Sequence, residues 1–104
     1  MPPSRRERIE TLLADDPDDA FLRYSLALEL DKEERHEESL DRLDGLMSDS
    51  PPYLPAFLMA AQQLVRLDRG ETACEVLKRG VETAQKQGED HAAAEMTELL
   101  ASLT

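Results

Sequence analysis

The sequence predicts an all-α domain of about six helices, arranged as antiparallel helix–turn–helix repeats. Apolar residues recur at spacings of three and four along the chain, which is the helical period, and no segment alternates with the period of two typical of a half-buried strand. Glycine and proline divide the 104 residues into segments of similar length. Pro51 follows Pro17 at an offset of 34 residues, across which small residues match small ones and large apolar residues mostly match large ones.

The first three helices are expected over residues 4–16, about 18–32 and about 36–47. Ser4 and Glu7 form the S-x-x-E pattern of a capping box, in which each side chain binds the other residue's backbone N–H, and this pattern marks the first helix start. Asp18 or Asp19 is the expected N-cap of the second helix. Asp19 also precedes Arg23 by four residues, a spacing at which opposite charges pair on a helix.

The last three helices are expected from about residue 52, over about 71–85 and over 89–103. Pro55 is compatible with the fourth helix because proline is tolerated in the first turn. Gly45 and Gly80 fall inside predicted helices, where glycine is unfavourable relative to alanine. Each glycine either permits a close approach of two helices or is simply tolerated.

The matched positions resemble the tetratricopeptide repeat, a helix–turn–helix unit of 34 residues. The family pattern runs Trp, Leu, Gly and Tyr on the first helix, Ala and Phe on the second, and a closing Pro. Three positions depart from it: Arg23 replaces an aromatic residue, Ser39 an alanine and Gln85 the second closing proline. The corresponding residues are Arg23, Leu26, Ala27, Leu30, Ser39, Leu43 and Pro51 in the first unit, and Phe57, Ala60, Ala61, Leu64, Ala73, Leu77 and Gln85 in the second.

The resemblance implies a short right-handed superhelix in a single domain over residues 1–104. Its expected parts are an N-terminal half-repeat helix at 4–16, a first repeat at 18–51, a second at 52–85 and a C-terminal capping helix at 89–103. Because one helical pair cannot bury both of its apolar faces, the units must stack into a continuous core. The alternative fold is another small antiparallel helical bundle.

Charge and composition exclude several classes of partner. With 12 basic and 23 acidic residues the net charge is −11, so nucleic acids and anionic membranes are not expected as partners. The longest apolar run, residues 56–61, is too short for a membrane span, and no secretory signal is visible at the N-terminus. The single cysteine, Cys74, favours a cytoplasmic setting. Residues 15–49 hold 13 of the acids, either as a solvated face or as a surface that attracts a basic partner.

No pattern for catalysis, cofactor binding or metal binding is visible. His36 lacks the second histidine of a His-Glu-x-x-His site, and His91 with Glu95 supplies only two ligands. Cys74 lies inside an apolar helix, where an inert thiol is expected. The chain is therefore expected to be a non-enzymatic protein without cofactor or metal. An enzyme or metal protein using His36 and His91 is the minor alternative.

In the tetratricopeptide family the first helices line a concave groove that binds peptides or helices. Family members that grip a terminal carboxylate place lysine and asparagine there, which this chain lacks at the matching positions. We therefore expect a scaffold or adaptor module whose apolar groove binds a peptide or helix with basic flanks. Alternatively, a terminal helix covers this face, or the face mediates homodimerisation of a structural subunit. The candidate groove residues are Phe21, Tyr24, Leu28, Leu58, Gln62, Val65 and Arg66.

Overall fold

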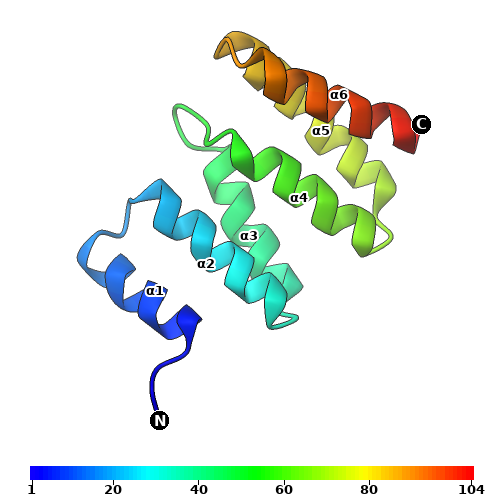
Figure 1. The fold of residues 1–104 in the computed structure, drawn as a ribbon. Helices are drawn as coiled ribbons and strands as arrows, with labels where there is room; N and C mark the ends of the chain where they lie inside the picture. The colour runs from blue at the N-terminus through cyan, green and yellow to red at the C-terminus, as the bar shows by residue number, and fades with distance from the viewer.

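The computed structural model describes all 104 residues and contains six α-helices and no strand. The helices pack in chain order, each on the next, and build an elongated array of 46 × 29 × 18 Å. The two termini lie at opposite ends of this array (Figure 1). The predicted all-α fold is thus confirmed. The helices are α1 (Arg5–Asp15), α2 (Ala20–Lys32), α3 (His36–Met47), α4 (Pro55–Arg66), α5 (Gly70–Lys86) and α6 (Asp90–Leu103).

Local capping fixes the first two helix starts. The backbone N–H of Ser4 donates to Glu7 Oε1 and the N–H of Glu7 donates to Ser4 Oγ, both at 3.1 Å, so the predicted capping box is present. Asp19 is the N-cap of α2, where its Oδ1 accepts from the Leu22 N–H at 2.8 Å. These contacts satisfy N–H groups that have no partner inside the helix.

Arg23 occupies the position where the resembling family has an aromatic residue. The expected pair with Asp19 is wrong, because the Asp19 carboxylate caps α2. Instead, Arg23 Nη1 lies 2.6 Å from Asp49 Oδ2, in the linker after α3. The matching residue of the second repeat, Phe57, is buried in the core. The first repeat therefore replaces an aromatic packing contact by an ion pair.

The linkers before α2 and α4 each contain one of the prolines that are 34 residues apart. Pro17 lies in the linker over residues 16–19 and Pro51 in the linker over residues 48–54. α4 begins only at Pro55, three residues later than expected, with this proline at the first helical position. α5 continues to Lys86, because Gln85 retains the backbone N–H that a closing proline would lack.

The 34-residue offset also appears in the backbone of the turns within each repeat. Glu34, after α2, has a φ of 61° and Asp68, after α4, has a φ of 62°. Each turn therefore ends its first helix with a left-handed residue at the equivalent position, and this conformation redirects the chain into the second helix. The residue after each closes the same backbone hydrogen bond: Arg35 N–H to Leu30 C=O at 2.9 Å and Arg69 N–H to Leu64 C=O at 2.8 Å.

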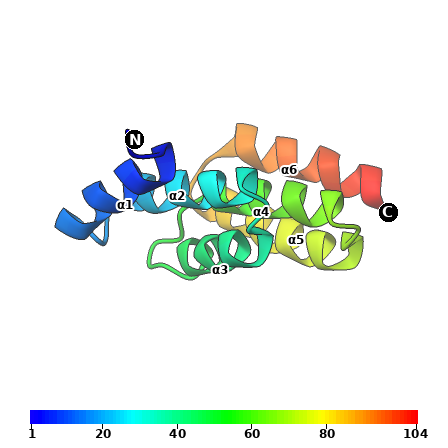
Figure 2. The same cartoon turned by 90° about the horizontal axis from the view of Figure 1, so that it is seen from below.

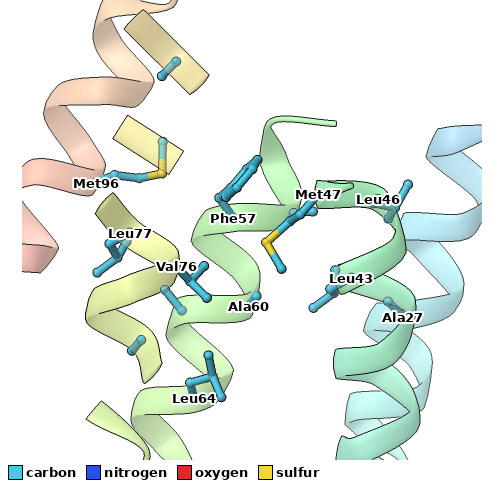
Figure 3. Packing of buried hydrophobic residues seen from close by; sticks show 14 of the residues in the cluster. Ala27, Leu43, Leu46, Met47, Phe57, Ala60, Leu64, Val76, Leu77 and Met96 are labelled. Atoms are coloured by element: carbon cyan, nitrogen blue, oxygen red, sulfur yellow. The ribbon is translucent and has the colours of Figure 1, made fainter. Parts of the chain in front are cut away.

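The core extends from α2 to α6, and a smaller cluster joins α1 to α2. Figure 3 shows Phe57 of α4 within this core and Met96 reaching in from α6. A Cβ on Gly80 would lie 2.9 Å from the Phe57 Cβ and 2.5 Å from the Met96 Sδ, so Gly80 allows a close helix approach. A Cβ on Gly45 would meet only Arg23 Nη2, at 3.5 Å, so this glycine is tolerated. The following pairs, matched at the 34-residue offset, are buried at both positions: Leu26 and Ala60, Ala27 and Ala61, Leu30 and Leu64, Ser39 and Ala73, and Leu43 and Leu77.

Candidate protein-binding site

An apolar pocket opens between α4 and α6, with one wall from α2. Its volume is about 240 Å³ and most of its lining residues are hydrophobic. We call it the α4–α6 pocket. In Figure 2, α6 lies on one side of the array and α3 and α5 lie on the other, with α4 between them. The pocket is lined by Tyr24 of α2, by Leu54, Pro55, Leu58, Met59 and Gln62 at α4, and by Ala92, Glu95 and Met96 of α6.

Three of the seven predicted groove residues line this pocket together. They are Tyr24, Leu58 and Gln62, from two neighbouring first helices. Phe21 and Leu28 do not line it, but they lie on the same face of α2 as Tyr24 by their helical spacing. Phe21 is 66% exposed. At the 34-residue offset the α2 residues Phe21, Tyr24 and Leu28 match the pocket residues Pro55, Leu58 and Gln62 of α4.

Tyr24 forms the α2 wall of the pocket and packs against a second aromatic ring. It is half-buried, and its ring centroid lies 5.5 Å from that of Tyr53, with the rings tilted by 55°. Tilted aromatic pairs at this separation are stabilising. Burial, and to a lesser degree Tyr53, raises the pKa of the Tyr24 phenol. The hydroxyl therefore remains protonated at neutral pH.

Val65 and Arg66 lie outside the pocket. Val65 is partly exposed, and Arg66 Nη2 lies 2.8 Å from Asp31 Oδ2, linking the end of α4 to the end of α2. His36 Nδ1 lies 2.7 Å from the other Asp31 oxygen. Burial raises the pKa of Asp31, but the hydrogen bonds from Arg66 and His36 outweigh this effect and leave the pKa lowered. Arg66 thus joins two repeats.

The sequence reasoning missed the contribution of α6. The sequence predicts only a capping helix over residues 89–103, in which Glu95 is considered solely as one of two ligands with His91. The structure places Ala92, Glu95 and Met96 in the pocket wall. The available signal was their spacing of three and four residues, which puts them on one side of a helix. It does not reveal which neighbour that side faces.

Other chemistry-bearing residues are dispersed. No three His, Cys, Asp or Glu side chains gather into a group that could hold a metal ion. His36 is bound to Asp31, His91 is exposed, and Cys74 is half-buried on α5. None of the six helices combines the length and the apolar character needed to cross a membrane. The α4–α6 pocket is therefore the candidate functional site.

Two solved structures resemble this chain along most of its length. A tetratricopeptide repeat domain protein from Salinibacter ruber, solved by solution NMR, is 26% identical with a TM-score of 0.78, covering 84% of this chain and 88% of the other. The solution structure of a protein from Bordetella parapertussis is 24% identical with a TM-score of 0.81, covering 98% and 89%. The sequence matches no protein-family model and no curated protein. Together with the repeated turns and the buried pairs 34 residues apart, these overlays show that the chain has a tetratricopeptide-repeat-like fold.

Proposed function

We propose that the chain is a protein-interaction module whose α4–α6 pocket receives an apolar side chain from a peptide or helix of a partner protein. Folds of this type generally mediate protein interactions and are typically non-catalytic. The observation that carries the proposal is an apolar pocket open to solvent, formed by residues from α2, α4 and α6. Such pockets supply affinity by removing apolar surface from water.

The size of the pocket favours a side chain over a small-molecule ligand. Sites for drug-sized ligands have volumes of roughly 300–1,000 Å³ and enclose most of the ligand. The α4–α6 pocket holds about 240 Å³ and is open. A single large aliphatic or aromatic side chain on a docked segment suits this space. The rest of the segment would then lie outside the pocket, along the helices.

The α2 face next to the pocket offers room for such a segment. Phe21 is exposed and Leu28 is half-buried, on the side of α2 that also carries Tyr24. A segment anchored in the pocket can continue over this face toward α1. The partner is therefore expected to carry further apolar residues beyond its anchor, as an amphipathic helix or an extended peptide does.

Charge favours a basic partner. Glu95 is the only charged residue in the pocket lining and takes part in no ion pair. A lysine or arginine beside the anchor would pair with it. Two copies of this chain, each with a net charge of −11, repel each other, which disfavours homodimerisation. The same negative charge attracts a basic partner and so accelerates its encounter with this chain.

The proposal is tested with the double variant Tyr24→Ala and Leu58→Ala, assayed for binding of the proteins that the unaltered chain captures. Loss of two anchor contacts should weaken binding by at least about tenfold. Tyr24 is half-buried, so its removal can also disturb the fold. A loss of binding therefore counts only if circular dichroism shows that the variant keeps its helical content. Gln62→Trp provides a second test: Gln62 is exposed, so a large side chain there blocks the pocket from its rim. The matched control is Leu12→Ala, an exposed leucine on α1. Unchanged binding by all variants would refute the proposal.

The alternative role as a homodimeric structural subunit has its own test. Light scattering across a dilution series should give the mass of one chain at low concentration if the pocket awaits a foreign partner. A doubled mass that Leu58→Ala abolishes would establish homodimerisation through this face. That result would replace the proposed function.

A further inference from the structure

A second cleft lies between α3 and α5, with its floor formed by α4. We call it the α3–α5 cleft; its volume is about 210 Å³. Figure 3 shows Met47 of α3 and Val76 of α5 approaching α4 from two sides, near Ala60 and Leu64. The cleft is lined by Leu40, Asp41, Asp44 and Met47 of α3, Ala60 and Leu64 of α4, and Thr72 and Val76 of α5.

This cleft is separate from the α4–α6 pocket. Ala60 and Leu64 follow the pocket residues Leu58 and Gln62 by two positions each. Two residues correspond to about 200° of rotation around an α-helix, so the two pairs face opposite sides of α4. A segment bound in one site therefore does not reach the other, and the two sites can be tested independently.

The α3 wall of the cleft carries its only charges. Asp41 and Asp44 are three residues apart, adjacent on the helix surface, and both are exposed. Neither takes part in an ion pair or a side-chain hydrogen bond, whereas Glu37 on the same helix is bound by Arg69. Two free carboxylates thus stand beside an apolar floor. A ligand that satisfies both features has an apolar stem and a cationic head.

We propose that the α3–α5 cleft binds an arginine side chain of a partner protein. The methylene stem of arginine packs on apolar surface while its charged head remains near water. The planar guanidinium carries several N–H donors in a fixed fork and contacts two carboxylates at once, which a compact ammonium does less well. The stem would lie over Ala60 and Leu64 and the head would pair with Asp41 and Asp44. Charge complementarity selects this occupant over an acidic or purely apolar one.

The test is an NMR titration of the full chain with a capped helical peptide of twelve residues, alanine throughout except for arginine at positions 4 and 8. Backbone amide shifts should concentrate in residues 40–47 and 72–76. The same peptide with lysine should bind more weakly. Asp41→Asn with Asp44→Asn should weaken arginine-peptide binding about fivefold, the loss of two exposed ion pairs. Asp15→Asn with Asp16→Asn removes the same charge at the end of α1 and should change binding less than twofold.

A variant that leaves the charge unaltered gives a second readout. Thr72 is exposed at the edge of the cleft, so Thr72→Phe should obstruct it and abolish the shifts in α3 and α5. Three results would each overturn the proposal. The amide shifts could centre on Leu58 and Ala92, the Asp15/Asp16 variant could lose as much arginine-peptide affinity as the Asp41/Asp44 variant, or the lysine peptide could bind as tightly as the arginine peptide. Self-association detected in the unliganded chain and lost in Thr72→Phe would also overturn it, since a second copy would then occupy the cleft.

Discussion

Ser39 of α3 and Gln63 of α4 are joined by a buried hydrogen bond, in which Gln63 Nε2 donates to Ser39 Oγ at 3.0 Å. Ser39 Oγ in turn donates to the Ala27 carbonyl oxygen at 2.6 Å. Both side chains are almost fully excluded from solvent. The serine stands where the tetratricopeptide family has alanine, so this departure from the pattern brings its own polar partner into the core.

The same contact recurs one repeat earlier in charged form. Arg5 and Glu29 precede Ser39 and Gln63 by 34 residues, and Arg5 Nε lies 2.8 Å from Glu29 Oε1. In both places the second helix of one unit binds the first helix of the next, counting α1 as the second helix of a half-repeat. The junction between repeats is therefore marked by a polar pair at a fixed position.

Ser39→Ala should lower the free energy of unfolding by about 1–3 kcal/mol, because it leaves the buried Gln63 amide without a partner. Adding Gln63→Met removes that orphaned amide, together with its Oε1 atom, which has no partner even in the unaltered chain. The double variant should recover most of the loss. Urea unfolding of the two single variants and the double variant measures the coupling. Additive losses would show that the two side chains do not interact.

The two helical glycines should respond in opposite ways to alanine. Gly45→Ala should raise the free energy of unfolding by about 0.5–1 kcal/mol, since alanine is the better helix former and its Cβ meets only ordinary contacts. Gly80→Ala should lower it by about 1–3 kcal/mol through overpacking against Phe57 and Met96. Thermal or urea unfolding distinguishes the signs. A gain for Gly80→Ala would mean that α4 and α6 separate freely from α5.

The repeated turn residues provide stabilising substitutions. Glu34 and Asp68 adopt positive φ values that are unfavourable for every residue except glycine. Neither side chain forms an ion pair or a hydrogen bond. Glu34→Gly and Asp68→Gly should each raise the free energy of unfolding by about 1 kcal/mol. Gly88→Ala, at a φ of 73° before α6, is the matched opposite and should lower it by about 1 kcal/mol. Equal effects of all three changes would exclude this explanation.

The inter-repeat pair of Asp31 with Arg66 should make stability depend on pH. The pKa of Asp31 in the folded chain lies below the ordinary value of 3.8. The ionised carboxylate therefore stabilises the fold above pH 3.8, and this contribution is lost as the pH falls through the folded-state pKa. Asp31→Asn should cost less than about 1 kcal/mol at neutral pH, because Arg66 is largely exposed. The variant should also lose less stability than the unaltered chain between pH 5 and about pH 3. Parallel acid titrations would contradict this.

Local signals made much of the fold predictable. The capping box of Ser4 and the N-cap of Asp19 act within one helical turn, so sequence reasoning finds them. The contact of Arg23 with Asp49 spans 26 residues and depends on how α2 meets the end of α3. Nothing in the sequence around Glu34 marks it as a left-handed residue, because the usual glycine is absent. Only the 34-residue offset links it to Asp68.

The pocket was predictable only as far as the repeat extends. The 34-residue offset assigns one side of α2 and α4 to core packing, and the tetratricopeptide resemblance then makes the remaining residues of these helices groove candidates. Of those candidates Tyr24, Leu58 and Gln62 line the pocket, although Tyr24 and Leu58 also pack partly against the core. Met96 enters the pocket because α6 packs on α5 and reaches α4, a placement that the repeat period does not specify. Arg66 has the sequence position of a groove residue, but its guanidinium is bound by Asp31, which lies 35 residues earlier in the chain.

Site-specific photocrosslinking tests the central claim most directly. A benzophenone amino acid in place of Gln62, at the edge of the α4–α6 pocket, should crosslink to an apolar residue of another protein that has lysine or arginine beside it. The same group in place of Leu12 on α1 should not capture that protein, and adding Leu58→Ala should remove the Gln62 crosslink. Crosslinks from Gln62 only to other copies of this chain, or equal capture from Leu12, would contradict the account.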